Sequence, residues 1–271
     1  MAACLLHVSD LHTGTHEEPE VEQALHALVR RIRPELIVAS GDLTNRGTRS
    51  QHEQAARFLR SLETPVLAVP GNHDLPYTFP ARFTRPWAEF ERQWQTTEPT
   101  HSSAAMHVVG LNSARPYRHQ GGALGGEQLR AAAERLQASP EGAYRVAVLH
   151  HHLLGAPWRA ARKRPVSRRS AVLRALVAAG ADLILSGHIH QAALSERHEF
   201  EVVEGDARAA VVSIAPGLGQ PRPNRLGEAR GLHVYEPGER TLAVHTYIWR
   251  DGDWDLTAQR TFPRGAGPLA G

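Results

Sequence analysis

The chain has 271 residues, of which 41% are hydrophobic, 22% charged and 6% aromatic, a composition typical of water-soluble globular proteins. Its one cysteine, Cys4, excludes an internal disulfide framework, and no apolar run approaches the ~20 residues of a membrane-spanning helix. The N-terminal residues lack the basic and apolar regions of a secretory signal. We therefore expect a cytoplasmic protein with no membrane partner.

Two features of the composition are unusual. The formal net charge is only +3, although 31 residues are basic and Lys163 is the single lysine among them. Such a small excess does not predict a nucleic-acid-binding protein, in which basic residues gather on one face. The chain also holds 17 histidines, and imidazole is both the commonest metal ligand and the usual acid or base near neutral pH.

Over the first two thirds of the chain, short apolar runs alternate with amphipathic stretches. The apolar runs predict strands at Cys4–Ser9, Leu36–Ser40, Val66–Val69, His107–Leu111, Val146–Leu149 and Leu183–Leu185. The amphipathic stretches predict helices at Glu20–Ile32, Ser50–Leu62, Arg82–Trp94, Glu127–Leu136 and Arg168–Ala178. This alternation predicts a layered α/β architecture.

After His190 the pattern becomes rich in strands. Four more are predicted, at Phe200–Val203, Ala210–Ile214, Leu232–Tyr235 and Leu242–Trp249, with a hairpin turn at Pro237-Gly238. We expect them to be antiparallel and to complete a second sheet. Because no linker divides the chain, we expect residues 1–264 to form a single domain and residues 265–271 a flexible C-terminal tail.

Five polar clusters each follow directly on a predicted strand. They are Asp10-Leu11-His12, Gly41-Asp42, Gly71-Asn72-His73-Asp74, His150-His151-His152 and Gly187-His188-Ile189-His190. Because ligands bind at the carboxyl ends of strands in α/β sheets, the five clusters are expected to converge on one site.

The residue types in these clusters indicate a metal site. Carboxylates, an amide oxygen and imidazoles bind hard or borderline divalent metals. Seven such ligands, one or two from each cluster, are too many for one tetrahedral zinc. Two metals that share a carboxylate would suit phosphoryl transfer. Each motif alone also has a structural interpretation: Gly-Asp as a turn, Asn-His-Asp as a helix cap, and the triple histidine as an exposed run. Their order and their common place after strands favour the metal site.

The ordered set of clusters resembles the calcineurin-like metallophosphoesterase family over residues 5–190. This resemblance implies a four-layer αββα sandwich, in which two mixed β-sheets are flanked by helices. The stretches around Gly71–Tyr77 and His150–His190 are most similar to bacterial phosphodiesterases of the cyclic-AMP type.

The resemblance also implies a metal ligand set. A first metal would be held by Asp10, His12 and His190, and a second by Asn72, His150 and His188, with Asp42 bridging the two. The expected cofactors are two divalent ions of Mn, Fe or Zn, among which these ligands do not choose. His151 is a rival to His150, because the family usually has His-x-Pro where this chain has three histidines.

His73 is the residue for which the resemblance implies a catalytic role. It would stabilise the phosphoryl oxygens or protonate the leaving alkoxide, and Asp74 would orient either His73 or the local turn. Many members carry a second Asp, three residues after the bridging one, that supports this histidine. Here that position is Asn45, which has no charge.

The implied activity is hydrolysis of a small phosphodiester by in-line attack of a hydroxide that bridges the metals. A 3′,5′-cyclic nucleotide is the leading substrate. A glycerophosphodiesterase, a phosphomonoesterase and a nuclease are alternatives within the family. A metal-binding scaffold protein is the alternative outside enzymes, since a retromer subunit uses this fold as a scaffold with a degraded metal site. The intact ligand set favours an enzyme, and neither the substrate-binding residues nor the oligomeric state follows from the sequence.

The segment Trp158–Arg169 is strongly basic, with six basic residues between Arg159 and Arg169. It has two interpretations. Its guanidinium groups would match phosphate oxygens if the segment reached over the metals, or it is a solvated loop in an arginine-rich protein.

Overall fold

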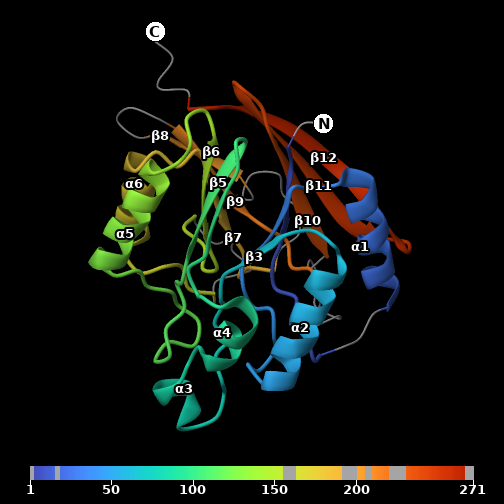
Figure 1. Ribbon diagram of the computed structural model, residues 1–271, viewed down its shortest axis with the longest axis vertical. Coiled ribbons are helices and arrows are strands. Elements are labelled where there is room, and N and C mark those ends of the chain that lie inside the picture. Colours follow the sequence, from blue (N-terminus) through green and yellow to red (C-terminus); the bar gives the residue numbers. More distant parts are fainter. Residues whose placement is uncertain are drawn as a thin grey trace.

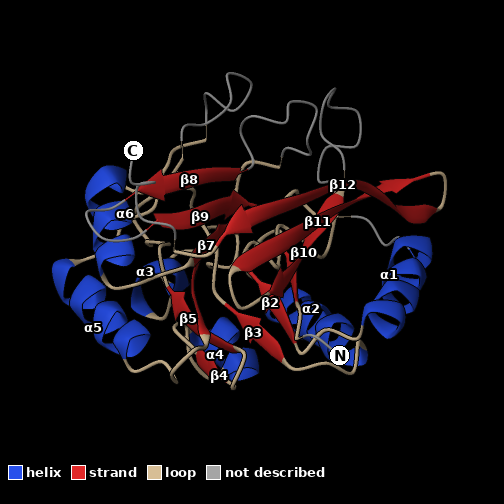
Figure 2. Ribbon diagram, turned by 90° about the horizontal axis from the view of Figure 1, so that it is seen from above, coloured by secondary structure: helices blue, strands red, loops and turns tan. Residues whose placement is uncertain are grey.

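A computed structural model describes residues 3–15, 19–154, 163–190, 200–204, 209–219 and 230–265. Two six-stranded sheets pack face to face, and helices cover their outer faces (Figures 1 and 2). The predicted α/β sandwich of four layers is therefore confirmed. None of the helices in the described residues is long and apolar enough to cross a membrane.

The first sheet combines N-terminal and C-terminal strands. Its members are β1 (Leu5–Val8), β2 (Leu36–Ala39), β3 (Val66–Ala68), β10 (Gly231–Pro237), β11 (Thr241–Arg250) and β12 (Asp253–Pro263). They lie in the order β12-β11-β10-β1-β2-β3. The pairs β1–β2 and β2–β3 are parallel, whereas β1–β10, β10–β11 and β11–β12 are antiparallel.

The second sheet holds the middle of the chain. Its members are β4 (Thr100–Ser102), β5 (Met106–Leu111), β6 (Tyr144–Leu149), β7 (Leu183–Ser186), β8 (Phe200–Glu204) and β9 (Ala209–Ile214). They lie in the order β4-β5-β6-β7-β9-β8, with parallel pairing from β5 to β9 and antiparallel strands at both edges.

Helices complete the outer layers. They are α1 (Pro19–Ile32), α2 (Arg49–Ser61), α3 (Ala81–Thr84), α4 (Ala88–Trp94), α5 (Gly126–Gln137) and α6 (Arg169–Ala178). Leu25 of α1 and Leu59 of α2 belong to the apolar core on the outer side of the first sheet, and Leu136 of α5 and Leu176 of α6 to the core outside the second. A third core fills the space between the sheets.

The start of α1 illustrates how the sequence specifies these elements. Pro19 occupies the first helical position, where a missing N–H is harmless. Glu20 and Glu22 in the first turn and Arg30 and Arg31 in the last turn complement the helix dipole.

Three expectations need correction. The predicted helix Arg82–Trp94 is two helices, α3 and α4, because Pro86 cannot continue the backbone hydrogen bonding of a helix. The C-terminal strands do not complete one sheet: β8 and β9 join the second sheet, whereas β10 pairs with β1 of the first sheet and β11 pairs with β10. Nor are all four antiparallel, because β9 pairs in parallel with β7. Strands β4 and β12 were not predicted.

Other expectations hold or lie beyond the described residues. The hairpin at Pro237-Gly238 is present, with the Gly238 N–H donating to the Thr241 carbonyl at 2.7 Å. Residues 266–271 of the expected tail and residues 155–162 around the basic segment lie outside the described residues.

Candidate metal centre

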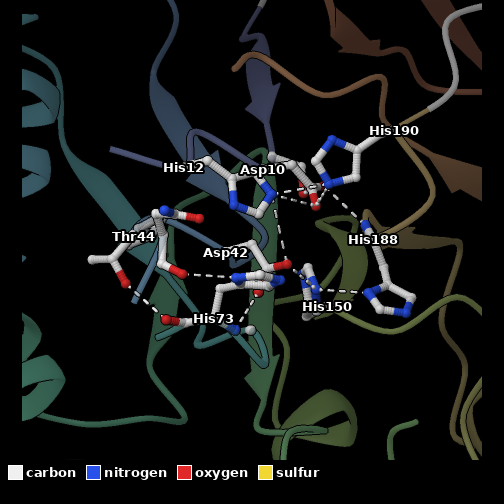
Figure 3. Close-up of polar contacts among 12 residues, drawn as sticks. Asp10, His12, Asp42, Thr44, His73, His150, His188 and His190 are labelled. Carbon is white, nitrogen blue, oxygen red and sulfur yellow. Dashed lines mark hydrogen bonds and ion pairs between the residues drawn. The ribbon is translucent and has the colours of Figure 1, made fainter. Parts of the chain in front are cut away.

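The five polar clusters meet where the strands of both sheets end (Figure 3). Within the first sheet, the Asp10 N–H donates to the Gly41 carbonyl at 2.9 Å. Within the second, the Gly187 N–H donates to the His150 carbonyl at 3.0 Å. The His188 N–H donates to Asp10 Oδ2 at 2.9 Å and so joins the two sheets at the centre. The convergence expected from strand-end positions is therefore what the fold produces.

A first group of donor atoms comes from Asp10, His12, Asp42 and His190, all buried and within 4.8 Å of one another. His190 Nε2 lies 3.0 Å from Asp10 Oδ1 and 2.9 Å from His12 Nε2. His12 Nε2 also lies 3.9 Å from Asp42 Oδ2. Two imidazoles and two carboxylates thus face one small volume, as ligands of a divalent metal do.

A second group consists of Asp42, His150 and His188. His150 Nε2 lies 3.2 Å from Asp42 Oδ2 and 3.2 Å from His188 Nδ1. Asp42 is the one residue common to both groups, and the same oxygen, Oδ2, lies near one histidine of each, His12 and His150. This geometry suits a carboxylate that bridges two ions.

Unpartnered buried oxygens also point to cations at this centre. Asp10 Oδ1, Asp42 Oδ2 and Asn72 Oδ1 accept no hydrogen bond among the described residues, although all three atoms are buried. A buried oxygen left without a partner costs roughly 1–3 kcal/mol, and more if it is charged. Asn72, 4% exposed, thus has the free carbonyl oxygen that a metal ligand requires.

The contacts of His150 give the clearest test of whether a metal fits. Its Nδ1–H donates to the Ser40 carbonyl at 2.8 Å. In a neutral ring Nε2 therefore carries no proton, and this nitrogen faces Asp42 Oδ2. Although burial opposes it, the charge of Asp42 raises the pKa of His150 to about 9. Either a second proton or a cation must therefore lie between Nε2 and the carboxylate. A metal ion bound there would replace that proton.

Outer contacts orient several of these side chains. His188 Nε2–H donates to the Gln120 carbonyl at 3.0 Å, which leaves Nδ1 free to face His150. The Ser9 hydroxyl donates to Asp10 Oδ2 at 2.6 Å, and the His73 N–H donates to Asp42 Oδ1 at 2.8 Å. In each carboxylate these bonds occupy one oxygen and leave the other to the centre.

His73 lies beside the centre, with its ring 4.7 Å from that of His12 and edge-on to it. Its Nδ1 lies 2.8 Å from the Asn45 carbonyl oxygen and 2.8 Å from the Tyr77 hydroxyl. The Asn45 contact is made by the backbone, so it does not need the carboxylate that many family members carry there. These bonds fix a proton on Nδ1 and leave Nε2 available to a ligand.

The Asp74 carboxylate contacts the backbone of the turn and, among the described residues, makes no hydrogen bond with the His73 ring. Its carboxylate accepts hydrogen bonds from the backbone N–H groups of Gly71, Leu43 and Thr44, at 2.8, 3.3 and 2.9 Å. Of the two roles considered for this residue, the contacts favour support of the turn that carries Asn72 and His73.

His151 is the less suitable of the two rival histidines. Its Nδ1 pairs with the Ser113 hydroxyl at 2.9 Å, and its donor atoms belong to neither group. The ring lies 4.7 Å from that of His188, so it packs against the centre.

The backbone at the centre is unusual. Five residues of the clusters have a left-handed backbone, which residues other than glycine rarely adopt. They are Asp10, His12, Asp42, His188 and His190, with φ values of 54°, 50°, 51°, 76° and 57°. Such conformations cost of order 1–3 kcal/mol each and gather at functional sites. No residue pattern in the sequence predicts them.

Glycines allow the strand ends to approach closely. A Cβ on Gly71 would collide with the Asp42 carboxylate, and one on Gly187 would collide with the Ser9 hydroxyl.

Three residues that support the centre were not predicted from the sequence: Ser9, Tyr77 and Gln120. The adjacency of Ser9 to Asp10 was a usable signal, whereas nothing in the sequence marks Gln120, which acts through its backbone carbonyl.

Comparisons with known proteins agree with this geometry. The family described as calcineurin-like phosphoesterase matches residues 5–192. The 3′,5′-cyclic adenosine monophosphate phosphodiesterase CpdA of Haemophilus influenzae is 29% identical over 256 residues, which are 89% of this chain and 85% of that protein. The probable glycerophosphodiester phosphodiesterase GpdQ of Arcobacter nitrofigilis is 24% identical over 163 residues, 55% of this chain and 56% of that protein.

A solved structure shares the fold. A dimetal phosphatase from Danio rerio superposes with a TM-score of 0.67 at 12% identity, covering 97% of this chain and 99% of that chain. The family match spans more than half of the chain and includes all five polar clusters. The chain therefore belongs to the calcineurin-like phosphoesterase family and is a metal-dependent phosphoric ester hydrolase.

Proposed function

We propose that the protein hydrolyses small phosphodiesters at a centre of two divalent metal ions, with a 3′,5′-cyclic nucleotide as the leading substrate. The observation that carries this proposal is the pair of donor groups that share Asp42 Oδ2. A single ion would not account for both groups, because His12 of the first and His150 of the second approach that oxygen separately.

The two donor groups support the proposed ligand set, and the unpartnered, buried Oδ1 supports the inclusion of Asn72. Asp10, His12 and His190 would hold the first ion, Asn72, His150 and His188 would hold the second, and Asp42 would bridge them. Two such ions, when bound, lower the pKa of water and neutralise charge on the oxygens of an in-line displacement. Mn, Fe and Zn all suit this mixture of oxygen and nitrogen donors.

His73 is the proposed catalytic residue. The Asn45 carbonyl and the Tyr77 hydroxyl hold its Nδ1, so Nε2 is the atom that meets the substrate. Nε2–H donates to a phosphoryl oxygen and then gives its proton to the leaving alkoxide. Proton transfer by a positioned side chain contributes typically 10²–10⁴-fold to a rate.

The relatives guide the choice of substrate. The cyclic-AMP phosphodiesterase is similar over most of both chains, whereas the glycerophosphodiester phosphodiesterase is similar over little more than half. This difference supports a cyclic nucleotide as the first candidate and a glycerophosphodiester as the second. A scaffold role is disfavoured, since a scaffold has no need of buried, unpartnered oxygens.

A substrate panel tests the proposal. Protein loaded with Mn²⁺ is assayed first on bis-p-nitrophenyl phosphate, then on cyclic AMP, 2′,3′-cyclic nucleotides, glycerophosphodiesters and phosphomonoesters. We expect turnover of the chromogenic diester and the highest kcat/KM on cyclic AMP. Absence of turnover on every diester would overturn the proposed activity, whereas a preference for glycerophosphodiesters would overturn only the leading substrate.

A further inference from the structure

We infer that an arginine-lined groove beside α6, separate from the metal centre, binds the diphosphate group of a small molecule. The groove has a volume of about 570 Å³. Its lining includes Arg118, Arg164, Arg168 and Arg169, together with the hydroxyl-bearing Ser167 and Ser170. None of the residues proposed to bind metal or to act in catalysis lines it.

Among the described residues, the positive charge in the groove has no acidic partner. No acidic residue lines it, and among the described residues none of its four arginines forms an ion pair. Arg118 donates to neutral partners, the Ser167 hydroxyl and the Gly122 carbonyl. Arg169 donates to the Leu154 carbonyl at 3.3 Å. These bonds orient two guanidinium groups without neutralising them, so the groove is a surface for anions.

The start of α6 adds to this field. The helix begins at Arg169, and Arg168, with a φ of 56°, supplies no capping hydrogen bond from its side chain. The first N–H groups of a helix have no partners within the helix, and the helix dipole favours negative charge there. The arginines and the helix terminus thus act on the same volume.

The size of the groove supports a ligand larger than a lone phosphate ion. Pockets for small organic ligands occupy about 300–1,000 Å³, which is more space than a lone phosphate ion needs. One guanidinium fork matches the oxygens of one phosphate, so four arginines exceed the requirement of a single phosphate group. A diphosphate carried by a small molecule matches both the charge and the volume.

The groove also contacts the loop that supports the metal centre. The Ser167 N–H donates to the Gly122 carbonyl at 2.9 Å, and two residues earlier the Gln120 carbonyl accepts from His188 Nε2 at 3.0 Å. The two sites share a loop but no proposed functional residue. Binding in the groove is therefore testable whether or not the proposed activity is correct.

Hydrogen–deuterium exchange on the metal-loaded protein tests the inference. The probes are methylenediphosphonate and α,β-methylene-ADP, which carry two phosphate-like groups, and AMP, which carries one. We expect the two-phosphate probes to slow exchange in residues 163–171, and the variant R164A/R168A to raise the concentration needed at least 10-fold. The control R130A/R174A removes two exposed arginines of α5 and α6 outside the groove and should change nothing.

The probe arms separate the sources of the ligand. Tighter binding of α,β-methylene-ADP identifies a nucleotide, and equal binding identifies the diphosphate itself. Equal weakening by the control variant, or AMP binding as tightly as the two-phosphate probes, would overturn the inference. So would tighter, Arg164-dependent binding of a single-stranded oligonucleotide. Hydrolysis of bis-p-nitrophenyl phosphate should be the same in both variants, which keeps this outcome independent of the proposed function.

Discussion

The two halves of the metal centre differ in how their histidines are held. In the second half, His150 Nδ1 and His188 Nε2 both donate to backbone carbonyls. In the first half, His12 Nδ1 and His190 Nδ1 are buried and have no hydrogen-bond partner among the described residues. Outer hydrogen bonds of this kind fix the ring and raise its basicity. The difference indicates that the proposed second site is preorganised, whereas the proposed first site depends more on the ion itself.

The substitution with the largest expected effect removes the group that both halves share. Asp42→Ala should lower the metal content from two ions toward none and reduce kcat by more than about 10³-fold, since loss of metal removes both charge neutralisation and water activation. Metal analysis and diester turnover measure the two effects. The exposed Asp255→Ala is the matched control, and a variant of Asp42 that kept both ions would show that this residue is not shared.

Replacement of His73 should separate catalysis from metal binding. His73→Ala is expected to keep both ions and lose about 10²–10⁴-fold in kcat, the usual contribution of a general acid. The exposed His119→Ala controls for loss of a histidine. Full activity in His73→Ala would remove it from the catalytic role, and loss of metal would instead make it part of the binding site.

Chelation tests the difference between the two halves directly. Outer hydrogen bonds are worth roughly 10–100-fold in metal affinity, so the two ions should leave in separate steps. His12→Ala should remove the weaker step and His150→Ala the tighter one, as followed by titration with a chelator. Release in one step, or loss of the tighter step in His12→Ala, would contradict the difference.

Tyr77 should have a smaller effect, through its hydrogen bond to His73. Tyr77→Phe removes the hydroxyl but keeps the Asn45 carbonyl contact, so we expect a several-fold loss of kcat and a shift in the pH profile of kcat. Unchanged metal content distinguishes this positioning role from a structural one. An unaltered pH profile would leave the Asn45 carbonyl as the sole support of the ring.

Buried histidines away from the metals predict a dependence of stability on pH. Burial lowers the pKa of His7 and of His233 to about 3, against about 6.5 when unfolded. Between pH 6.5 and 3 the unfolded state binds more protons, so stability is full above pH 6.5 and falls below it by up to about 1.4 kcal/mol per pH unit for each histidine. Denaturant unfolding of His233→Gln should show a shallower decline, and the wild-type slope in this variant would exclude His233.

Much of this centre was predictable because parallel strands end at one edge of a sheet. That rule placed Asp10, Asp42 and His188 together although they are far apart in the chain. The supporting contacts were not predictable, because Ser40, Asn45 and Gln120 act through backbone carbonyls that any residue type could supply. The left-handed backbone conformation of several proposed ligands was equally unpredictable from the sequence.

The fold shows the same limits. The strands of the parallel core were predicted from continuous apolar runs, since both faces of each sheet are covered. Strand β12 was not predicted because most of its side chains are polar and exposed, as is common at a sheet edge. The apolar spacing of Arg82–Trp94 predicts one helix, but Pro86 divides the segment into two.

Electron paramagnetic resonance of the Mn²⁺-loaded protein tests most directly whether Asp42 bridges two ions. Two ions that share a carboxylate oxygen lie close enough for their spins to couple. We predict two Mn²⁺ per chain with the signal of a coupled pair in the wild type, and loss of that coupling in Asp42→Ala. A single ion per chain, or two ions with only isolated Mn²⁺ signals, would contradict the shared centre.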